Sequence, residues 1–186
     1  MQLPHLLKDP SIPESCYIDV SARINGNVRM GEHCSVWFNA SIRGDVHEIV
    51  LGEYTNVQDG CILHTTRDRF PLCIGSQVTF GHGAIAHGCT ISDHVFIGMQ
   101  SLIMDGAEIG NHVLIGAGSL VTEGANIPTG VLAFGRPAKV IRELTQDEYT
   151  MLEKHAKKYA GYATAYRQAG LFTTWKDNPF YRSPNL

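Results

Sequence analysis

Three of the nine histidines in this 186-residue chain are of a type and spacing that suit a metal centre: His64, His82 and His87. Three imidazoles with an open fourth position are typical of a catalytic rather than a structural zinc site. His82 follows His64 by 18 residues, so a chain that repeats every 18 residues would stack the two on adjacent coils, with His87 near the same corner. We therefore predict these residues as metal ligands. Zn²⁺ is the predicted ion, with Fe²⁺ or Co²⁺ as alternatives, because all three ions accept imidazole.

Four polar residues precede His64 on what would be neighbouring coils: Arg43, Asp45, Gln58 and Asp59. A buried charge on the face of a packed repeat has to be paired or hydrogen-bonded, so Arg43 is predicted to pair with Asp45 or Asp59. The alternative is that these are solvated charges at the corners of the repeat. The Gln58 amide both donates and accepts hydrogen bonds, which suits the orientation of a metal-bound hydroxide.

A repeat of six residues has to position these side chains. Aliphatic residues recur at that spacing, and 17 of the 19 glycines lie between Gly26 and Gly135, where they can form tight corners. Period six fits neither an α-helix nor the two-residue alternation of a strand. It fits a hexapeptide β-helix, in which three short strands make one coil of 18 residues and the aliphatic residues point to the axis. The clearest run is Ile91, Ile97, Ile103, Ile109, Ile115, Val121 and Ile127.

The period is interrupted in three places, all of which bracket residues 43–88. An insertion of three residues follows Ile42, an insertion of five follows Leu63, and one residue is missing after Phe80. Tolerated loop variation is one interpretation, but this clustering favours a functional segment. Three other histidines share one corner position of the repeat, which predicts a structural role for them: His33, His94 and His112.

The pattern changes after Pro137. Thr145 to Glu148 has the sequence of a capping box, and apolar residues then follow at steps of three and four, which predicts an amphipathic helix over 145–170. The predicted division is an N-terminal segment 1–17, the hexapeptide-repeat β-helix 18–139, the helix 145–170 and a tail 171–186. The helix should lie along a face of the β-helix, with this stripe inward: Tyr149, Leu152, Ala156, Tyr159, Ala163 and Tyr166. Four aromatic residues predict that the tail docks: Phe172, Trp175, Phe180 and Tyr181.

Composition argues against several classes of protein. The formal net charge of −3 gives no basic surplus for binding nucleic acid or an anionic membrane surface. No run of 18 apolar residues predicts a membrane span, and the first residues lack the hydrophobic stretch of a signal peptide, so we expect a cytoplasmic protein. Five cysteines without a Cys-x-x-Cys pair predict reduced thiols rather than disulfides or a zinc knuckle.

Five segments are together more specific than the repeat: Ile42-Arg43-Gly44-Asp45, Asn56-Val57-Gln58-Asp59-Gly60, Leu63-His64, Gly81-His82 and His87-Gly88-Cys89-Thr90-Ile91. Through them, nearly the whole chain resembles the gamma-class carbonic anhydrase family. The resemblance implies a left-handed β-helix and a homotrimer with the metal between subunits. His64 and His87 would come from one subunit and His82 from its neighbour.

The same resemblance implies further roles. Arg43 and Asp45 would fall at the family's intersubunit ion-pair positions, Gln58 and Asp59 would lie beside the metal-bound water, and Tyr159 would reach the site from the helix. Two features depart from the family's pattern. Val46 stands where archetypal members carry a glutamate, and the insertion after His64 lacks the glutamate that shuttles protons, with Asp68 as its only carboxylate. The chain therefore resembles the short-loop branch of the family.

The predicted function is hydration of carbon dioxide by a metal-bound hydroxide at a trimer interface, since such a metal lowers the pKa of its water to about 7. Two other enzymes remain open. One is a metal-dependent thioesterase acting on acyl-coenzyme A, and the other is a hexapeptide acyltransferase with a histidine as general base. A non-catalytic metal-binding or assembly subunit is the remaining hypothesis.

Overall fold

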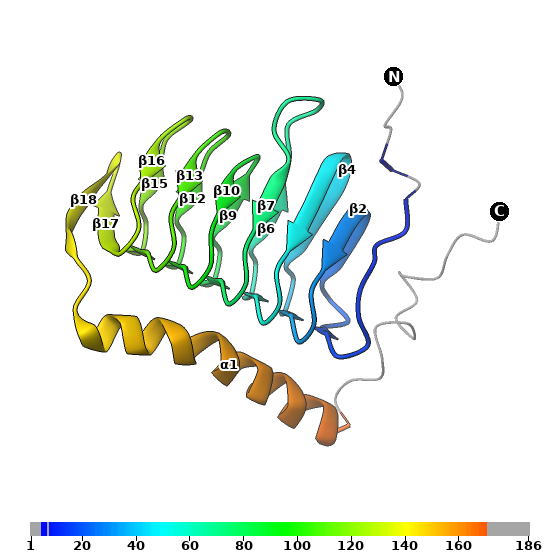
Figure 1. Ribbon diagram of the computed structural model, residues 1–186. Coiled ribbons are helices and arrows are strands. Elements are labelled where there is room, and N and C mark those ends of the chain that lie inside the picture. Colours follow the sequence, from blue (N-terminus) through cyan, green and yellow to red (C-terminus); the bar gives the residue numbers. More distant parts are fainter. Residues whose placement is uncertain (1–4, 7, 171–186) are drawn as a thin grey trace.

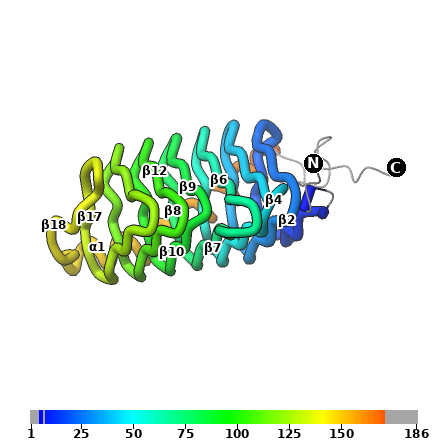
Figure 2. Tube along the Cα trace, turned by 90° about the horizontal axis from the view of Figure 1, so that it is seen from above, coloured from blue at the N-terminus to red at the C-terminus, as the bar shows by residue number. Residues whose placement is uncertain are grey.

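The computed structural model, which describes residues 5–6 and 8–170, is a three-sided parallel β-helix flanked by one α-helix (Figure 1). The predicted β-helix of hexapeptide repeats followed by a C-terminal helix is confirmed. Figure 2 shows successive coils stacked side by side along one axis. The first side consists of parallel strands that pair from coil to coil: β1 (Tyr17–Ile18), β3 (Ser35–Val36), β5 (Asn56–Val57), β8 (Thr79–Phe80), β11 (Phe96–Ile97), β14 (Leu114–Ile115) and β17 (Val131–Gly135).

The other two sides meet at a corner that two long strands cross, β2 (Arg23–Met30) and β4 (Ser41–Leu51). The second side continues with β6 (Ile62–His64), β9 (Ile85–His87), β12 (Leu102–Ile103) and β15 (Leu120–Val121). The third side continues with β7 (Leu72–Ile74), β10 (Thr90–Ile91), β13 (Glu108–Ile109) and β16 (Asn126–Ile127). β18 (Ala138–Glu143) folds back antiparallel on β17 and covers its free edge.

The aliphatic residue of each hexapeptide points to the interior and stacks on its equivalent in the next coil. Ile97 pairs with Ile115 across β11 and β14, and both side chains are buried. The whole predicted run from Ile91 to Ile127 is buried in the same way. Because no coil can bury these side chains alone, the array is held together by contacts between neighbouring coils.

The corner histidines have the structural role that their spacing predicts. His33, His94 and His112 all adopt a left-handed backbone conformation, with φ between 52° and 58°. The rings of His94 and His112 stack with their centroids 4.6 Å apart. Turns of the repeat need this conformation, which is uncommon for residues other than glycine.

All three interruptions of the repeat fall at the corner where the second side passes into the third. The three extra residues lie within β4, because Ile42 and Leu51 still pair with Ile24 and Met30 of β2. The five extra residues lie in the loop over 65–71, which projects beyond the coils between β6 and β7 (Figure 1). The missing residue lies in the turn between β9 and β10, directly after His87.

The predicted stacking of His82 on His64 is wrong. β6 and β9 pair His64 with His87, so His87 is the residue that lies one coil away at the same place. The insertion after His64 lengthens this coil to 23 residues, and a count of 18 therefore stops five residues short. His82 comes before β9, at the opposite end of that strand from His87.

The α-helix α1 (Gln146–Gln168) lies along the first side of the β-helix (Figure 1). Thr145 and Glu148 form the predicted capping box at its start. Leu152, Ala156 and Ala163, which belong to the predicted apolar stripe, are buried against the coils. The helix thereby brings its side chains close to the turns that precede the second side.

Other predictions concern the chain as a whole. All five cysteines are free thiols, and four of them are buried. No helix among the described residues is long and apolar enough to cross a bilayer. The four aromatic residues of the tail lie outside the described residues: Phe172, Trp175, Phe180 and Tyr181.

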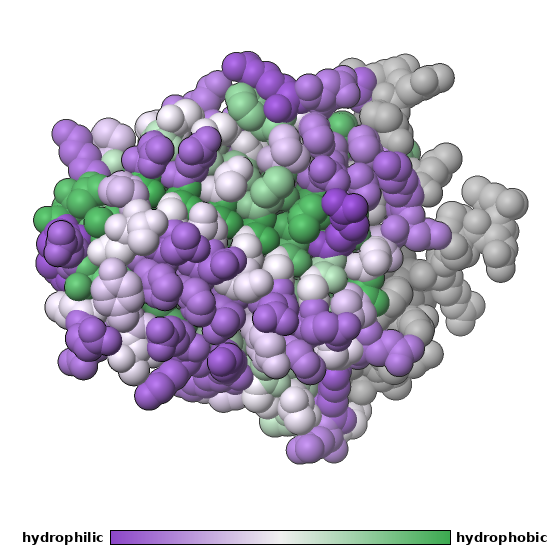
Figure 3. All heavy atoms as spheres, in the orientation of Figure 1, coloured by the Kyte–Doolittle hydropathy of each residue, from purple (hydrophilic) through white to green (hydrophobic). Residues whose placement is uncertain are grey.

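Hydrophobic side chains also reach the surface. Figure 3 shows hydrophobic patches among hydrophilic ones on the third side, which faces the viewer there, whereas Figure 2 places β6, β9 and β12 of the second side on the opposite face. On the second side, residues that alternate with the buried ones pair from coil to coil, and Ile62 at the start of this series is 44% exposed. We call this series the apolar ladder: Ile62, Ile85, Leu102 and Leu120. Contiguous exposed apolar surface is typical of an interaction site.

We predict that Ile97→Asp unfolds the array, because an unpaired carboxylate among buried aliphatic side chains costs several kcal/mol. Ile141→Asp makes the same chemical change at a position in β18 that is 57% exposed, and it should shift the free energy of unfolding by no more than about 0.5 kcal/mol. Urea unfolding followed by circular dichroism measures both. A transition like that of the wild type in Ile97→Asp would contradict the packing described above.

Candidate metal centre

Two imidazole rings meet at the interrupted corner. His64 ends β6 and His87 ends β9, and the register of the two strands places the histidines one above the other. The His64 Nδ1 atom lies 3.0 Å from the His87 Nε2 atom, and the ring planes are inclined at 63°. The His64 side chain is 16% exposed and the His87 side chain 34% exposed, so the pair lies just beneath the surface.

An aspartate holds the outer nitrogen of each ring. Asp45 Oδ1 lies 3.1 Å from His64 Nε2, and Asp105 Oδ1 lies 2.7 Å from His87 Nδ1. Because a carboxylate accepts hydrogen bonds, we assign the proton of each neutral ring to its outer nitrogen. The inner nitrogens then direct their lone pairs at one another, an arrangement that a bound cation would stabilise.

Both aspartates are in turn fixed from outside. Arg43 Nη1 donates to Asp45 Oδ2 over 2.6 Å, so Arg43 pairs with Asp45 rather than Asp59. Thr66 Oγ1 donates to Asp105 Oδ2 over 2.7 Å. A continuous series of polar contacts therefore runs along the corner. We call it the corner row: Arg43, Asp45, His64, His87, Asp105 and Thr66.

Burial and neighbouring charge favour a neutral His64 and an ionised Asp45. Burial, the largest effect, lowers the pKa of His64, and the charge of Arg43 adds to it against the hydrogen bond to Asp45. Burial would raise the pKa of Asp45, but the hydrogen bonds from Arg43 and His64 outweigh it and hold that pKa below its ordinary value. A neutral imidazole is the form that binds a metal, and a carboxylate is the form that orients it.

A matching pair, Asp59 and His82, lies at the opposite end of the second side. His82 Nδ1 is 2.7 Å from Asp59 Oδ2, and the two side chains are 52% and 43% exposed. Because the Asp59 carboxylate accepts a hydrogen bond, we assign the proton of His82 to Nδ1, which leaves a lone pair on His82 Nε2. His64 follows Asp59 by five residues, which is roughly 16 Å of extended chain.

Gln58 lies buried next to this pair. Its Nε2 atom donates to Asn56 Oδ1 over 3.2 Å, and Asn56 Nδ2 donates to Thr79 Oγ1 over 2.8 Å. Tyr159 of α1 lies near Gln58, and the interaction between the two side chains is the smallest of the effects on the Tyr159 pKa. Burial, the largest effect, raises the pKa of the Tyr159 hydroxyl, so the phenol is a neutral hydrogen-bonding group at neutral pH.

The eight predicted site residues thus fall into two groups. The corner row holds Arg43, Asp45, His64 and His87. The second, which we call the helix-side group, holds Gln58, Asp59, His82 and Tyr159. Within the residues that the structure describes, no cluster of three or more His, Cys, Asp or Glu side chains is placed to hold a metal ion in one chain.

Two members of the corner row were missed from the sequence, Asp105 and Thr66. Asp105 follows His87 by 18 residues, one more than the offset of 17 at which β9 and β12 pair Ala86 with Ile103, so a coil count could have placed Asp105 near His87. Thr66 carries no such signal, because it lies in the insertion and its contact with Asp105 spans 39 residues.

Known proteins share both the repeat and the sequence of this chain. Residues 88–123 match the family described as bacterial transferase hexapeptide (six repeats). A Methanocaldococcus jannaschii protein named "Probable carbonic anhydrase" is 50% identical over 148 residues, 80% of this chain and 92% of that protein. Mitochondrial gamma carbonic anhydrase 2 of Arabidopsis thaliana is 37% identical over 161 residues, 84% of this chain and 58% of that longer protein. The chain belongs to the gamma-class carbonic anhydrase-like family.

The family resemblance seen in the motifs is therefore confirmed, and solved structures share the fold of this gamma carbonic anhydrase-like chain. The crystal structure of a Bacillus cereus protein described as a proposed acetyltransferase is 47% identical, with a TM-score of 0.84. That match covers 87% of this chain and 94% of the other. Homologues named carbonic anhydrase imply a metal cofactor for the family in general.

The interface between α1 and the coils makes the stability of this gamma carbonic anhydrase-like chain depend on pH. His155 Nδ1 lies 3.3 Å from Thr79 Oγ1, and burial, with the charge of Lys158 as a smaller cause, lowers the pKa of His155 below its ordinary 6.5. The unfolded chain therefore binds this proton more readily, and folding stability falls as the pH drops through 6.5. We predict a smaller fall between about pH 7.5 and pH 5.5 in His155→Gln than in the wild type, measured by urea unfolding at fixed protein concentration. An equal fall would contradict this.

Proposed function

We propose that this protein is a metal-dependent carbonic anhydrase that hydrates carbon dioxide at sites shared between the protomers of a homotrimer. One observation carries the proposal: each of the three predicted ligands has one ring nitrogen held by an aspartate, which leaves the other nitrogen for a metal, and the remaining nitrogens of His64 and His87 face each other. Histidines that bind metals commonly donate their second N–H to a carboxylate, which fixes the tautomer and the direction of the ring. The pairs are His64 with Asp45, His82 with Asp59 and His87 with Asp105.

The donor set fits Zn²⁺, with Fe²⁺ or Co²⁺ as alternatives. Two imidazole nitrogens on one tetrahedral Zn²⁺, each at about 2.0–2.1 Å, are about 3.3 Å apart. The free nitrogens of His64 and His87 are 3.0 Å apart, which is close to this spacing. An ion held by three neutral imidazoles lowers the pKa of a coordinated water from 15.7 to about 7.

His82 of the partner subunit is the proposed third ligand. The corner row and His82 lie at opposite edges of the second side, and the apolar ladder lies between them. Two different edges that meet form a heterologous contact, which closes into a ring under threefold symmetry. The contact that buries the ladder would thereby bring His82 of the partner subunit to His64 and His87.

The helix-side group supplies the polar groups beside the proposed ligand. The buried Gln58 amide donates to Asn56, and Gln58 is the residue before Asp59 of the Asp59–His82 pair. We assign to Gln58 the orientation of the attacking water by hydrogen bonding, and to Tyr159 the positioning of Gln58. Asp59 holds the Nδ1 proton of His82. Because the insertion after His64 lacks the family's proton-shuttle glutamate, proton release would fall to Asp59, to Asp68 or to buffer.

A second candidate function is chemistry on acyl-coenzyme A. The observation that favours it is the 47% identity to the Bacillus cereus structure described as a proposed acetyltransferase. Thioester hydrolysis would use the same metal ligands, whereas acyl transfer would need none. One preparation assayed for metal content, carbon dioxide hydration and acetyl-coenzyme A turnover decides among them, and full metal with neither activity would favour a non-catalytic assembly role.

Mixing two defective variants tests whether the site is shared. His82→Ala removes the ligand at one edge and His64→Ala removes a ligand at the other, so neither variant alone should bind stoichiometric Zn²⁺ or hydrate carbon dioxide. In a mixed trimer, intact His64 and His87 of one subunit meet intact His82 of another. Unfolding and reassembling the two variants together should therefore restore one site in each mixed trimer, measured as Zn²⁺ per subunit and as hydration rate.

His33→Ala is the control for the mixing experiment, because the His33 ring packs on Tyr54, which belongs to neither group. On its own, it should keep full metal content and full activity. If the reassembled mixture remains free of metal although both variants fold and form trimers, the site does not lie between protomers.

Gln58→Ala should leave metal content at the wild-type level and lower kcat/KM for carbon dioxide hydration. Loss of one preorganised hydrogen-bonding group at a reacting oxygen typically costs on the order of 10²-fold in rate. Stopped-flow hydration with a pH indicator measures the rate, and elemental analysis of the same sample measures the metal. Metal loss that matches the loss of rate would show that Gln58 supports the site rather than orients water.

A further inference from the structure

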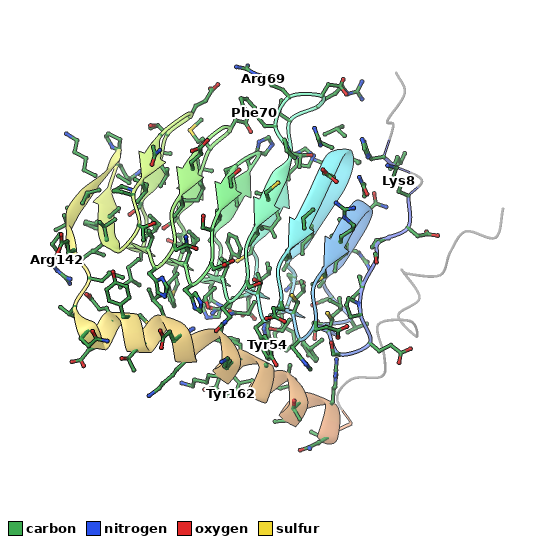
Figure 4. The ribbon with its side chains drawn as sticks, in the orientation of Figure 1. Lys8, Tyr54, Arg69, Phe70, Arg142 and Tyr162 are labelled. Atoms are coloured by element: carbon green, nitrogen blue, oxygen red, sulfur yellow. The ribbon has the colours of Figure 1, made fainter. Side chains whose placement is uncertain are left out.

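The inserted loop over 65–71 has a base that its own backbone fixes. Thr66 and Phe70 exchange two backbone hydrogen bonds of 3.2 Å, and Asp68 near the tip has a φ of 54°. The loop stands clear of the coils at the corner opposite α1, where Figure 4 marks Arg69 and Phe70. The Arg69 guanidinium lies over the Phe70 ring, 4.6 Å from its centroid. Thr66 is therefore held by a closed turn rather than by a long free segment.

Phe70 packs the loop against the following coils at two glycines. A Cβ atom on Gly88 would lie 2.7 Å from the Phe70 Cβ atom, and a Cβ atom on Gly106 would lie 3.0 Å from its Cε1 atom. A Cβ atom on Gly88 would also collide with Asp105. Gly88 directly follows His87, in the turn that is one residue short. The insertion and the shortened turn therefore fit each other, and both lie beside one ligand.

Thr66 is the residue through which the loop contacts the corner row. Its hydroxyl donates to Asp105 Oδ2 over 2.7 Å, and Asp105 Oδ1 accepts from His87 Nδ1 over 2.7 Å. Each oxygen of the carboxylate has a partner, so the carboxylate cannot turn without breaking one of these bonds. The direction of the His87 ring thus depends on a hydroxyl in the inserted loop.

We propose that Thr66, in the loop over 65–71, is a positioning residue for a metal ligand. Thr66 fixes Asp105, and Asp105 fixes His87 in the tautomer and direction that leave Nε2 for the metal. This inference rests on the proposed function, because His87 is a ligand only there. Thr66 and Asp105 act through His87 and are positioning residues.

Titration of the full-length, metal-free trimer with Co²⁺ against a competing chelator tests this, since visible absorption reports the geometry of bound Co²⁺. Asp105→Asn keeps the size of the side chain and should weaken Co²⁺ affinity by about 10- to 100-fold. Thr66→Val removes only the hydroxyl and should weaken it by less, with an absorption change in the same direction. Thr66→Ser keeps the hydroxyl and should restore the wild-type affinity.

The double variant Thr66→Val/Asp105→Asn separates positioning from general damage. If Thr66 acts through Asp105, the double variant loses no more affinity than Asp105→Asn alone, whereas independent effects add. Thr65→Val is the matched control, because the Thr65 hydroxyl is buried and makes no hydrogen bond within the described residues. This control should bind Co²⁺ as the wild type does.

Three results would overturn the inference: wild-type affinity in Asp105→Asn and Thr66→Val, additive losses in the double variant, or a loss in Thr65→Val as large as in Thr66→Val. Each of these can occur while the wild-type protein binds Co²⁺ and hydrates carbon dioxide, and the proposed function then stands. If the wild-type protein binds no Co²⁺, the proposed function is wrong and this inference is wrong with it.

Discussion

Two imidazole nitrogens face each other across 3.0 Å, and the geometry of the interrupted corner depends on what lies between them. Two lone pairs at that distance repel, so unconstrained rings would rotate apart. Asp45 and Asp105 prevent this rotation by holding the outer nitrogens. A positive charge shared by the inner nitrogens converts the repulsion into attraction. Burial disfavours a proton on His64, and in the proposed site a divalent metal ion would supply this charge.

The contact between His64 and His87 is a consequence of coil length. Each coil of the solenoid contacts only its neighbours, so residues can be added or removed at one corner while the aliphatic side chains at the axis keep their register. The insertion after β6 makes His87, rather than the residue 18 positions along, the partner of His64. The shortened turn after His87 then leaves Gly88, whose missing side chain gives Phe70 and Asp105 their space. The insertion after β6 and the shortened turn after His87 look like loop variation in the sequence, but together they form the corner at which His64 and His87 meet.

The sequence predicts the parts of the structure that follow the period. Every coil needs an aliphatic residue at the same place, so Ile97 and its equivalents could be assigned to the axis, and the shared conformation of His94 and His112 could be assigned to a corner. Register across an insertion cannot be predicted this way, because looped residues lengthen the chain without advancing the coil. His82 was misplaced for that reason. Asp105 was missed because an aspartate at a corner looks solvated until its contact with His87 is known.

In the proposed trimer, assembly and metal binding depend on the same surface. The corner row and His82 lie at opposite edges of the side that carries the apolar ladder, so one contact buries the ladder and brings the third imidazole to the other two. A single protomer offers two free nitrogens at 3.0 Å, and the partner subunit supplies the remaining one. A metal ion that binds only the assembled form stabilises assembly by mass action, and assembly raises metal affinity by the same free energy. In an isolated chain the apolar ladder is exposed and only two of the three proposed imidazole ligands are in place. One contact between subunits would bury the ladder and complete the ligand set.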